Sequence, residues 1–235
     1  MATKTKKNRE EEMKKKRIMI AGAVVLCFCI VAVLITVFMI PKGDAGGTDP
    51  VSKAETEEGD TGEKNPADSA GNCYADIEIQ DYGTITVQLD QTSAPITTEN
   101  FIKLAESGFY DGLTFHRIME GFMMQGGDPE GTGMGGSDQT IVGEFSANGY
   151  DNDLSHTRGA ISMARSADYD SASSQFFIVH QDSTFLDGEY AVFGYVTEGM
   201  EIVDQICESA EPTDDNGTIP AEQQPIITKI TIRTE

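Results

Sequence analysis

The 235-residue sequence has few of the residue types that build metal centres and nucleic-acid interfaces. It contains three histidines and four cysteines, and no histidine lies in an H-E-x-x-H or cysteine-rich setting, so a zinc site is not supported. Residues 73–235 hold six Lys and Arg against 28 Asp and Glu, a charge that repels nucleic acid and anionic membrane surfaces. A G-x-S-x-G motif is missing too, so hydrolysis has no visible nucleophile.

The first forty residues combine a basic end with a long apolar run. Residues 1–17 contain eight Lys and Arg against three Glu, and residues 18–40 contain no charge at all. About 20 apolar residues span a bilayer core, so 18–40 is predicted to be a transmembrane helix. The positive-inside rule then keeps 1–17 in the cytoplasm and places the rest of the chain outside.

A cleaved signal peptide is the alternative interpretation of the same run. Its apolar core is usually only about 7 to 15 residues long, which favours the membrane span. Gly43, Asp44 and Ala45 form a weak cleavage site that keeps a secreted form open. Cys27 and Cys29 are interpreted as membrane-buried thiols, with lipidation as the alternative.

The remainder of the chain divides into a linker and a domain. Residues 41–72 have almost no large apolar side chains and are predicted to be a flexible acidic linker. Residues 73–235 are long and apolar enough to bury one substantial core. Cys73 and Cys207 could form a disulfide outside the membrane, but the sequence does not show that they are close.

Within 73–235, short alternating runs predict a mostly β domain. Residues 75–79 and 85–89 alternate around a turn at 81–83, and the segment 226–235 alternates again. A helix is predicted after Pro95, with Thr97 or Thr98 as N-cap and Gly108 as the stop, and a second helix from Gly199 to Cys207. Many short strands with two helices favour a closed or sandwiched β architecture.

Several motifs suggest sites but lack the context that such sites need. Residues 131–136 match G-x-G-x-x-G, yet Asp128 and Pro129 precede them where a dinucleotide site needs a strand, so a flexible loop is predicted. The acidic segments 151–153 and 214–217 lack the full calcium-loop spacing and are predicted to be solvated turns. Each of the three histidines is expected to be a structural residue that hydrogen-bonds its neighbours.

Four motifs in order carry a family likeness: "FHRIMEGFMMQGGD" from residue 115, "GAISMAR" from 159, "SASSQFFIV" from 171 and "FLDGEYAVFGYV" from 185. Together they closely resemble the cyclophilin-type peptidyl-prolyl cis-trans isomerases over essentially all of 73–235. The resemblance implies a closed eight-stranded antiparallel β-barrel capped by two α-helices. It also implies isomerisation of X-Pro bonds in proline-containing polypeptides without metal or cofactor.

By the family's pattern, Arg117 is the catalytic residue and Gln125 binds the substrate backbone and orients Arg117. The pattern also implies a substrate-binding set: Phe122, Met123, Ala164, Arg165, Gln175, Phe177, Phe185, Leu186 and Tyr190. Phe115, Ile118 and Phe176 are expected to face the barrel interior. Without the other motifs, Arg117 would instead be expected to pair with Glu120 or Asp128.

Three positions depart from the family's pattern. Phe185 stands where many members have Trp and lacks the indole N–H, which argues against the cyclosporin binding that the resemblance otherwise allows. Tyr190 stands where His is frequent. Arg165 stands where Asn is frequent, and the change should be mild if only the backbone of Arg165 meets the substrate.

The sequence therefore predicts a membrane-anchored bacterial form of this family that assists the folding of exported polypeptides. A tethered, non-catalytic module or chaperone that binds proline segments is the alternative, and a purely structural surface protein is a second.

Overall fold

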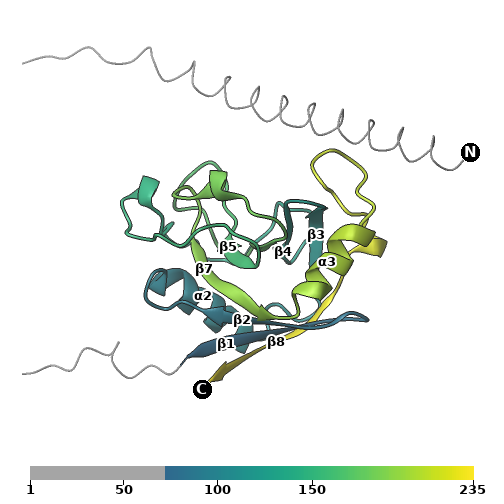
Figure 1. Ribbon diagram of the computed structural model, residues 1–235, viewed down its shortest axis with the longest axis horizontal. Coiled ribbons are helices and arrows are strands. Elements are labelled where there is room, and N and C mark those ends of the chain that lie inside the picture. Colours follow the sequence, from purple (N-terminus) through teal and green to yellow (C-terminus); the bar gives the residue numbers. More distant parts are fainter. Residues whose placement is uncertain (1–71) are drawn as a thin grey trace, which may run out of the picture. The chain divides into compact units, whose positions relative to one another are not determined.

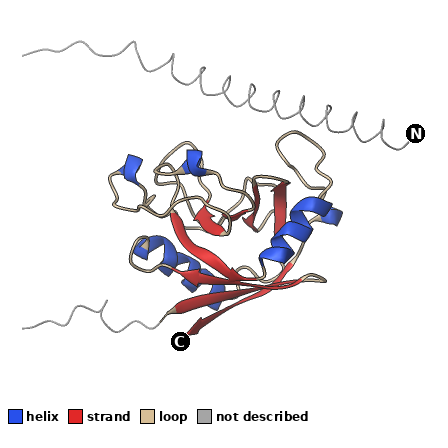
Figure 2. Cartoon of the chain, viewed as in Figure 1, coloured by secondary structure: helices blue, strands red, loops and turns tan. Residues whose placement is uncertain are grey.

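The computed structural model describes residues 72–235. In this part of the chain, eight strands form one antiparallel sheet, accompanied by two α-helices and three short 3-10 helices (Figure 1, Figure 2). The strands are β1 (Cys73–Ile79), β2 (Gly83–Leu89), β3 (Thr114–Met119), β4 (Met123–Asp128), β5 (Ala160–Met163), β6 (Phe176–Val179), β7 (Val192–Glu198) and β8 (Ile227–Thr234). The helices are α2 (Pro95–Glu106), η2 (Ser146–Asn148), η3 (Thr184–Leu186), α3 (Met200–Ser209) and η4 (Ala221–Gln223).

The alternating runs form the strands that they predict. In β1, every second residue from Cys73 to Ile79 is buried, and its partner β2 follows through a tight turn in which Asp81 adopts a φ of 64°. Alternation places one face of each strand on the core, because successive side chains point to opposite sides of a sheet. The predicted closing strand is β8, which pairs with β1.

The predicted closed barrel is wrong in one respect, because the sheet is open. Its strand order is β3-β4-β6-β5-β7-β2-β1-β8, and the edge strands β3 and β8 share no ladder. They approach only near the single bridge between Thr114 and Ile226. The outer edge of β3 is instead occupied by residues 217–219, since Ile118 donates its N–H to Gly217 and Ile219 donates to His116. Pro225, just before β8, has no N–H to extend that ladder.

Helix α2 begins and ends close to the prediction, but its cap differs. The N-cap residue is Ala94, and Thr97 and Thr98 lie inside the helix with their side chains buried. The carboxylate of Glu144, remote in sequence, accepts the N–H groups of Ile96 and Thr97 at 3.1 and 2.7 Å. A buried carboxylate thus satisfies the N–H groups that a threonine cap was expected to satisfy.

Helix α3 follows β7 through Gly199 and buries one face, composed of Ile202, Val203, Ile206 and Cys207. It contacts β2 and β4, whereas α2 contacts β7 and β8, and Figure 2 shows the two helices well apart on the sheet. The second predicted helix is therefore confirmed.

The main core lies between the sheet and the helices α2 and α3, and it is rich in aromatic rings. Phe176 makes edge-to-face contacts with Phe101, Tyr110 and Phe115, at centroid distances of 5.4 to 6.0 Å. Phe115, Ile118 and Phe176 are fully buried here, as predicted. This packing fixes Phe115 and Ile118 on the inner face of β3, although they are three residues apart, because the strand has a β-bulge or similar irregularity between Phe115 and Arg117.

The predicted segments 1–17 and 18–40, and all but the last residue of the predicted linker 41–72, lie outside the described residues. Among residues 72–235, no helix combines the length and hydrophobicity needed to cross a bilayer. Cys73 on β1 and Cys207 on α3 are both buried free thiols, so they do not form the disulfide considered from the sequence. Burial raises the pKa of Cys207 to about 12, which keeps this thiol protonated and unreactive.

Candidate active site

Arg117 lies on the face of β3 opposite the main core. Phe115 and Ile118 point inward, while Arg117 and Met119 are only partly buried. Across the ladder, Arg117 is the partner of Gln125 on β4. An irregularity of the β-bulge type between Phe115 and Arg117 interrupts the alternation of β3, so the guanidinium lies outside the core and beside an amide side chain.

The guanidinium of Arg117 has polar partners on two sides. Its Nε donates to the carbonyl oxygen of Asn216 at 2.7 Å, and its Nη1 donates to Oε1 of Gln125 at 3.2 Å. The ring of Phe122 lies 5.9 Å from the guanidinium carbon. Burial lowers the pKa of Arg117, while Tyr190 and Asp214 act in the opposite direction.

No carboxylate in residues 72–235 forms a salt bridge with Arg117, and the alternative pairings with Glu120 and Asp128 are not found. Asp128 accepts the N–H groups of Glu130, Thr132 and Gly133 instead. These bonds attach the start of the glycine-rich loop 131–136 to the end of β4. Arg117 is thus positioned by neutral acceptors, which leave its charge uncompensated at close range.

A second apolar cluster, separate from the main core, lies beside Arg117. Its buried members are Met123, Ala160, Phe177, Val179 and Val192. Packed against them are Met119, Phe122, Leu154, Ala164, Leu186, Tyr190 and Tyr195. Six predicted site residues therefore share one cluster: Phe122, Met123, Ala164, Phe177, Leu186 and Tyr190. Phe185 extends it, with its ring 5.7 Å from Phe122 and 65% of the residue exposed.

An amide chain connects Arg117 to the glycine-rich loop. Gln125 Nε2 donates to Gln175 Oε1 at 2.9 Å, and Gln175 Nε2 donates to the carbonyl oxygens of Gly133 and Gly135. Gln125 can accept from Arg117 only through its oxygen, so this chain fixes the orientation of its amide.

Arg165 contributes more than its backbone. Its guanidinium carbon lies 4.6 to 5.1 Å from the ring centroids of Phe145, Tyr169 and Tyr190, and its side chain is only 9% exposed. Nε donates to the carbonyl oxygen of Glu189. Because a cation over aromatic faces is attracted to them, Arg165 holds Tyr190 at the edge of the apolar cluster.

Residues 74–232 match the protein family described as cyclophilin type peptidyl-prolyl cis-trans isomerase/CLD. The chain belongs to this family. It is 49% identical to peptidyl-prolyl cis-trans isomerase B of Bacillus subtilis over 123 residues, which cover 52% of this chain and 82% of the relative. It is 44% identical to a peptidyl-prolyl cis-trans isomerase of Helicobacter pylori over 139 residues, 58% of this chain and 82% of that one.

A solved structure shows the same fold. The chain resembles the crystal structure of a Cryptosporidium parvum cyclophilin determined in the presence of the dipeptide Ala-Pro, with a TM-score of 0.61 and 30% identity over 69% of this chain and 99% of that one. The family match and the named relatives together show that the chain described here is a peptidyl-prolyl cis-trans isomerase, which isomerises X-Pro peptide bonds.

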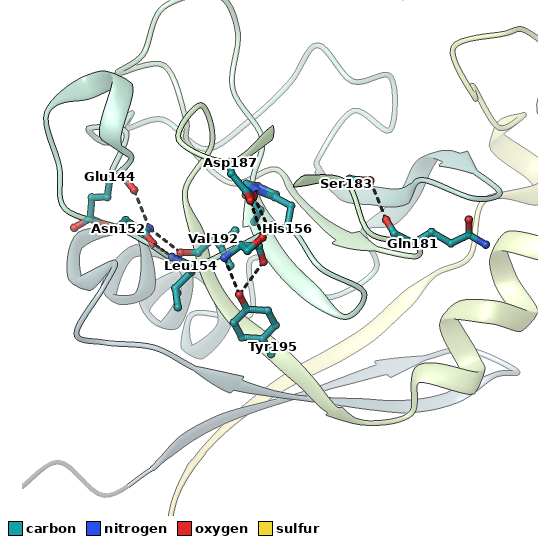
Figure 3. Close-up of polar contacts among 11 residues, drawn as sticks. Glu144, Asn152, Leu154, His156, Gln181, Ser183, Asp187, Val192 and Tyr195 are labelled. Atoms are coloured by element: carbon teal, nitrogen blue, oxygen red, sulfur yellow. Dashed lines mark hydrogen bonds and ion pairs between the residues drawn. The ribbon is translucent and has the colours of Figure 1, made fainter. Parts of the chain in front are cut away.

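His156 and Asp187 support the second apolar cluster, a role that the sequence did not predict. His156 Nδ1 lies 2.8 Å from Asp187 Oδ1 (Figure 3). Nε2 of the same ring lies 3.0 Å from Ser162 Oγ. The imidazole stacks on Phe177 with an interplanar angle of 13°. Burial lowers the pKa of His156 although Asp187 opposes the shift, which favours a neutral ring donating from Nδ1. The only sequence feature that could have suggested a role for Asp187 is its position in the motif "FLDG", directly after the predicted site residue Leu186.

His180 supports the turn between β3 and β4. Its Nδ1 accepts the N–H of Gly121 at 2.9 Å, and its Nε2 lies 3.2 Å from Asp204 of α3. Asp204 also binds Arg158 through both carboxylate oxygens, at 2.7 and 2.8 Å. The backbone of His180 donates to Phe122, so this residue positions the aromatic ring beside Arg117.

The general expectation for the histidines is confirmed for His156 and His180 and wrong for His116. Both ring nitrogens of His116 are buried and have no hydrogen-bond partner. Among the described residues, no three His, Cys, Asp or Glu side chains are grouped closely enough to hold a metal ion.

Proposed function

We propose that Arg117 catalyses prolyl isomerisation by stabilising the twisted amide. Rotation about an X-Pro bond breaks C–N resonance, against a barrier of roughly 18 to 20 kcal/mol. The proline nitrogen then gains a lone pair, which a guanidinium can bind more strongly than it binds either planar isomer. Each ~1.4 kcal/mol of this preference accelerates rotation about tenfold.

The observation that supports this role is a guanidinium without a carboxylate partner in the described residues, held at Nε by Asn216 beside an apolar cluster. The cluster suits a proline ring, because a ring placed against Phe122, Met123, Phe177 and Leu186 would exclude water near the cation. In this proposal Gln125 binds the substrate backbone, and Ala164, Arg165, Gln175, Phe185 and Tyr190 complete the binding surface. No acid, base or nucleophile is needed.

NMR exchange between the cis and trans forms of an Ala-Pro peptide tests this proposal, since uncatalysed exchange takes ~10 to 100 s. We expect Arg117→Ala to lose most turnover while keeping the fold, and Arg117→Lys to recover little, because a lysine cannot also donate to Asn216 from a planar fork. Unchanged turnover in a folded Arg117→Ala chain would refute the mechanism. Binding without acceleration in every chain would establish the proline-binding module instead.

We further propose that the protein is anchored in a bacterial membrane by residues 18–40, with 1–17 cytoplasmic and the isomerase domain outside, where it would assist the folding of exported chains. The basic segment followed by 23 uncharged residues supports this placement. Protease added to intact cells should release the domain. Complete protection would contradict the orientation, and release of the domain without protease would indicate a cleaved, secreted form.

A further inference from the structure

Met119 places a thioether directly against the guanidinium of Arg117. Its Sδ lies 3.4 Å from Arg117 Nη2, and the residue is only partly buried. Met119 also packs closely against Gly217, where an added Cβ would lie only 2.5 Å from Met119 Cγ. The side chain of Met119 therefore contacts both the cation and the backbone of residue 217.

The three nitrogens of this guanidinium differ in their partners among the described residues. Nε has the Asn216 oxygen and Nη1 has the Gln125 oxygen, but Nη2 has only the sulfur of Met119. A thioether is a weak acceptor. Nη2 can therefore leave the sulfur at little cost when a better acceptor, such as a twisted substrate amide, arrives.

We propose that Met119 is an oxidation site whose sulfoxide inhibits the isomerase, an inference that rests on the proposed role of Arg117. A peroxide supplies the oxidant: the O–O bond of hydrogen peroxide breaks, one oxygen bonds to Sδ, and the other leaves as water. Sulfur is oxidised by two electrons and peroxide is reduced by two. The sulfoxide oxygen is a strong acceptor next to Nη2, so it competes with the substrate for the guanidinium.

The other described methionines provide internal controls. Met123, Met124 and Met163 are at most 2% exposed and should resist the reagent. Met134 is 87% exposed on the glycine-rich loop and should be oxidised first. Met200 is partly buried like Met119 but lies at the start of α3, beside Gly159. Met200→Leu is therefore a control for Met119→Leu, because both methionines are partly buried but only Met119 contacts Arg117.

The test treats the full chain with hydrogen peroxide, maps sulfoxide at each methionine by mass spectrometry, and measures peptide isomerisation by NMR exchange. Each variant is compared with its own untreated sample. We expect wild-type turnover to fall about tenfold as Met119 is oxidised, not as Met134 is oxidised. Met134→Leu and Met200→Leu should show the same fall, and Met119→Leu should show little. Methionine sulfoxide reductases for both epimers should restore wild-type activity.

Several outcomes would overturn the inference: full oxidation of Met119 with turnover retained, an equal fall in Met119→Leu, or a Met119 that resists oxidation while Met200 reacts. Unfolding of the oxidised chain, seen by circular dichroism, would also overturn it, because the loss would then not come from Arg117. Absence of turnover in the untreated wild type is a different result and refutes the proposed function itself.

Discussion

His116 is the residue most out of keeping with its surroundings. It lies on β3 next to Arg117 and is 4% exposed, yet neither ring nitrogen has a partner. Burial lowers its pKa, while Asp128 raises it by a smaller amount. The folded protein therefore holds a neutral imidazole that the unfolded chain would protonate at about pH 6.5 and below.

This difference predicts a pH-dependent effect of His116→Leu. As pH falls below about 6.5, the unfolded state binds a proton that the folded state rejects, so the wild type loses stability until the folded pKa is reached. Leucine has no such loss. Urea unfolding at pH 7 and pH 5 should show the variant gaining stability relative to the wild type at the lower pH. An equal difference at both values would contradict this account.

At the scale of elements, α2 depends on a residue outside itself. Its first turn has no acidic side chain and its N-cap residue, Ala94, makes no side-chain bond. The only side chain in the described residues that satisfies its first N–H groups is Glu144, which is 2% exposed.

Glu144→Ala should therefore destabilise the domain by about 2 kcal/mol, because buried N–H groups at a helix start lose a charged acceptor. Glu144→Gln keeps one acceptor oxygen and should lose roughly half as much. Urea unfolding measures both. Equal losses in the two variants would show that side-chain packing, not capping, sets the cost.

The β3–β4 turn depends on His180 in a similar way. Two substitutions can separate the two contacts of the His180 ring, the hydrogen bond from Gly121 and the contact with Asp204. Asparagine places an acceptor near the position of Nδ1 and can keep the Gly121 bond, whereas glutamine places a donor near Nε2 and can keep the Asp204 bond. We expect His180→Gln to raise KM about fivefold, the loss of one hydrogen bond, and His180→Asn to change it little. A larger rise in KM for His180→Asn than for His180→Gln would show that the contact with Asp204 of α3, and not the Gly121 bond, positions Phe122.

For the whole molecule, the dominant property is charge. The isomerase domain has six basic side chains against 28 acidic ones, and at least three of its arginines are engaged by rings or carboxylates. Long-range repulsion should therefore act on any acidic substrate.

Peptides with lysine flanking Ala-Pro should accordingly be isomerised with a higher kcat/KM than peptides with glutamate there. The difference should be large at about 0.01 M salt, where the Debye length is ~30 Å, and small at about 1 M, where it is ~3 Å. NMR exchange measures both series. A preference that survives high salt would indicate a local contact in place of the overall field.

Local patterns in the sequence determined the strands β1, β2 and β8 and the approximate extents of α2 and α3. Periods of two and of 3.6 residues are properties of neighbouring residues and can be read without the fold. The four motifs also predicted which residues gather at the site, and Phe122, Met123, Ala164, Phe177, Leu186 and Tyr190 do share one cluster.

Tertiary structure alone decided which remote groups meet. Asn216 binds Arg117 from 99 residues away, Glu144 replaces the expected threonine cap, and residues 217–219 take the edge of β3 that a closed barrel would have given to β8. None of these contacts follows from a local period, because each depends on how separate segments pack and which backbone groups that packing leaves to be satisfied.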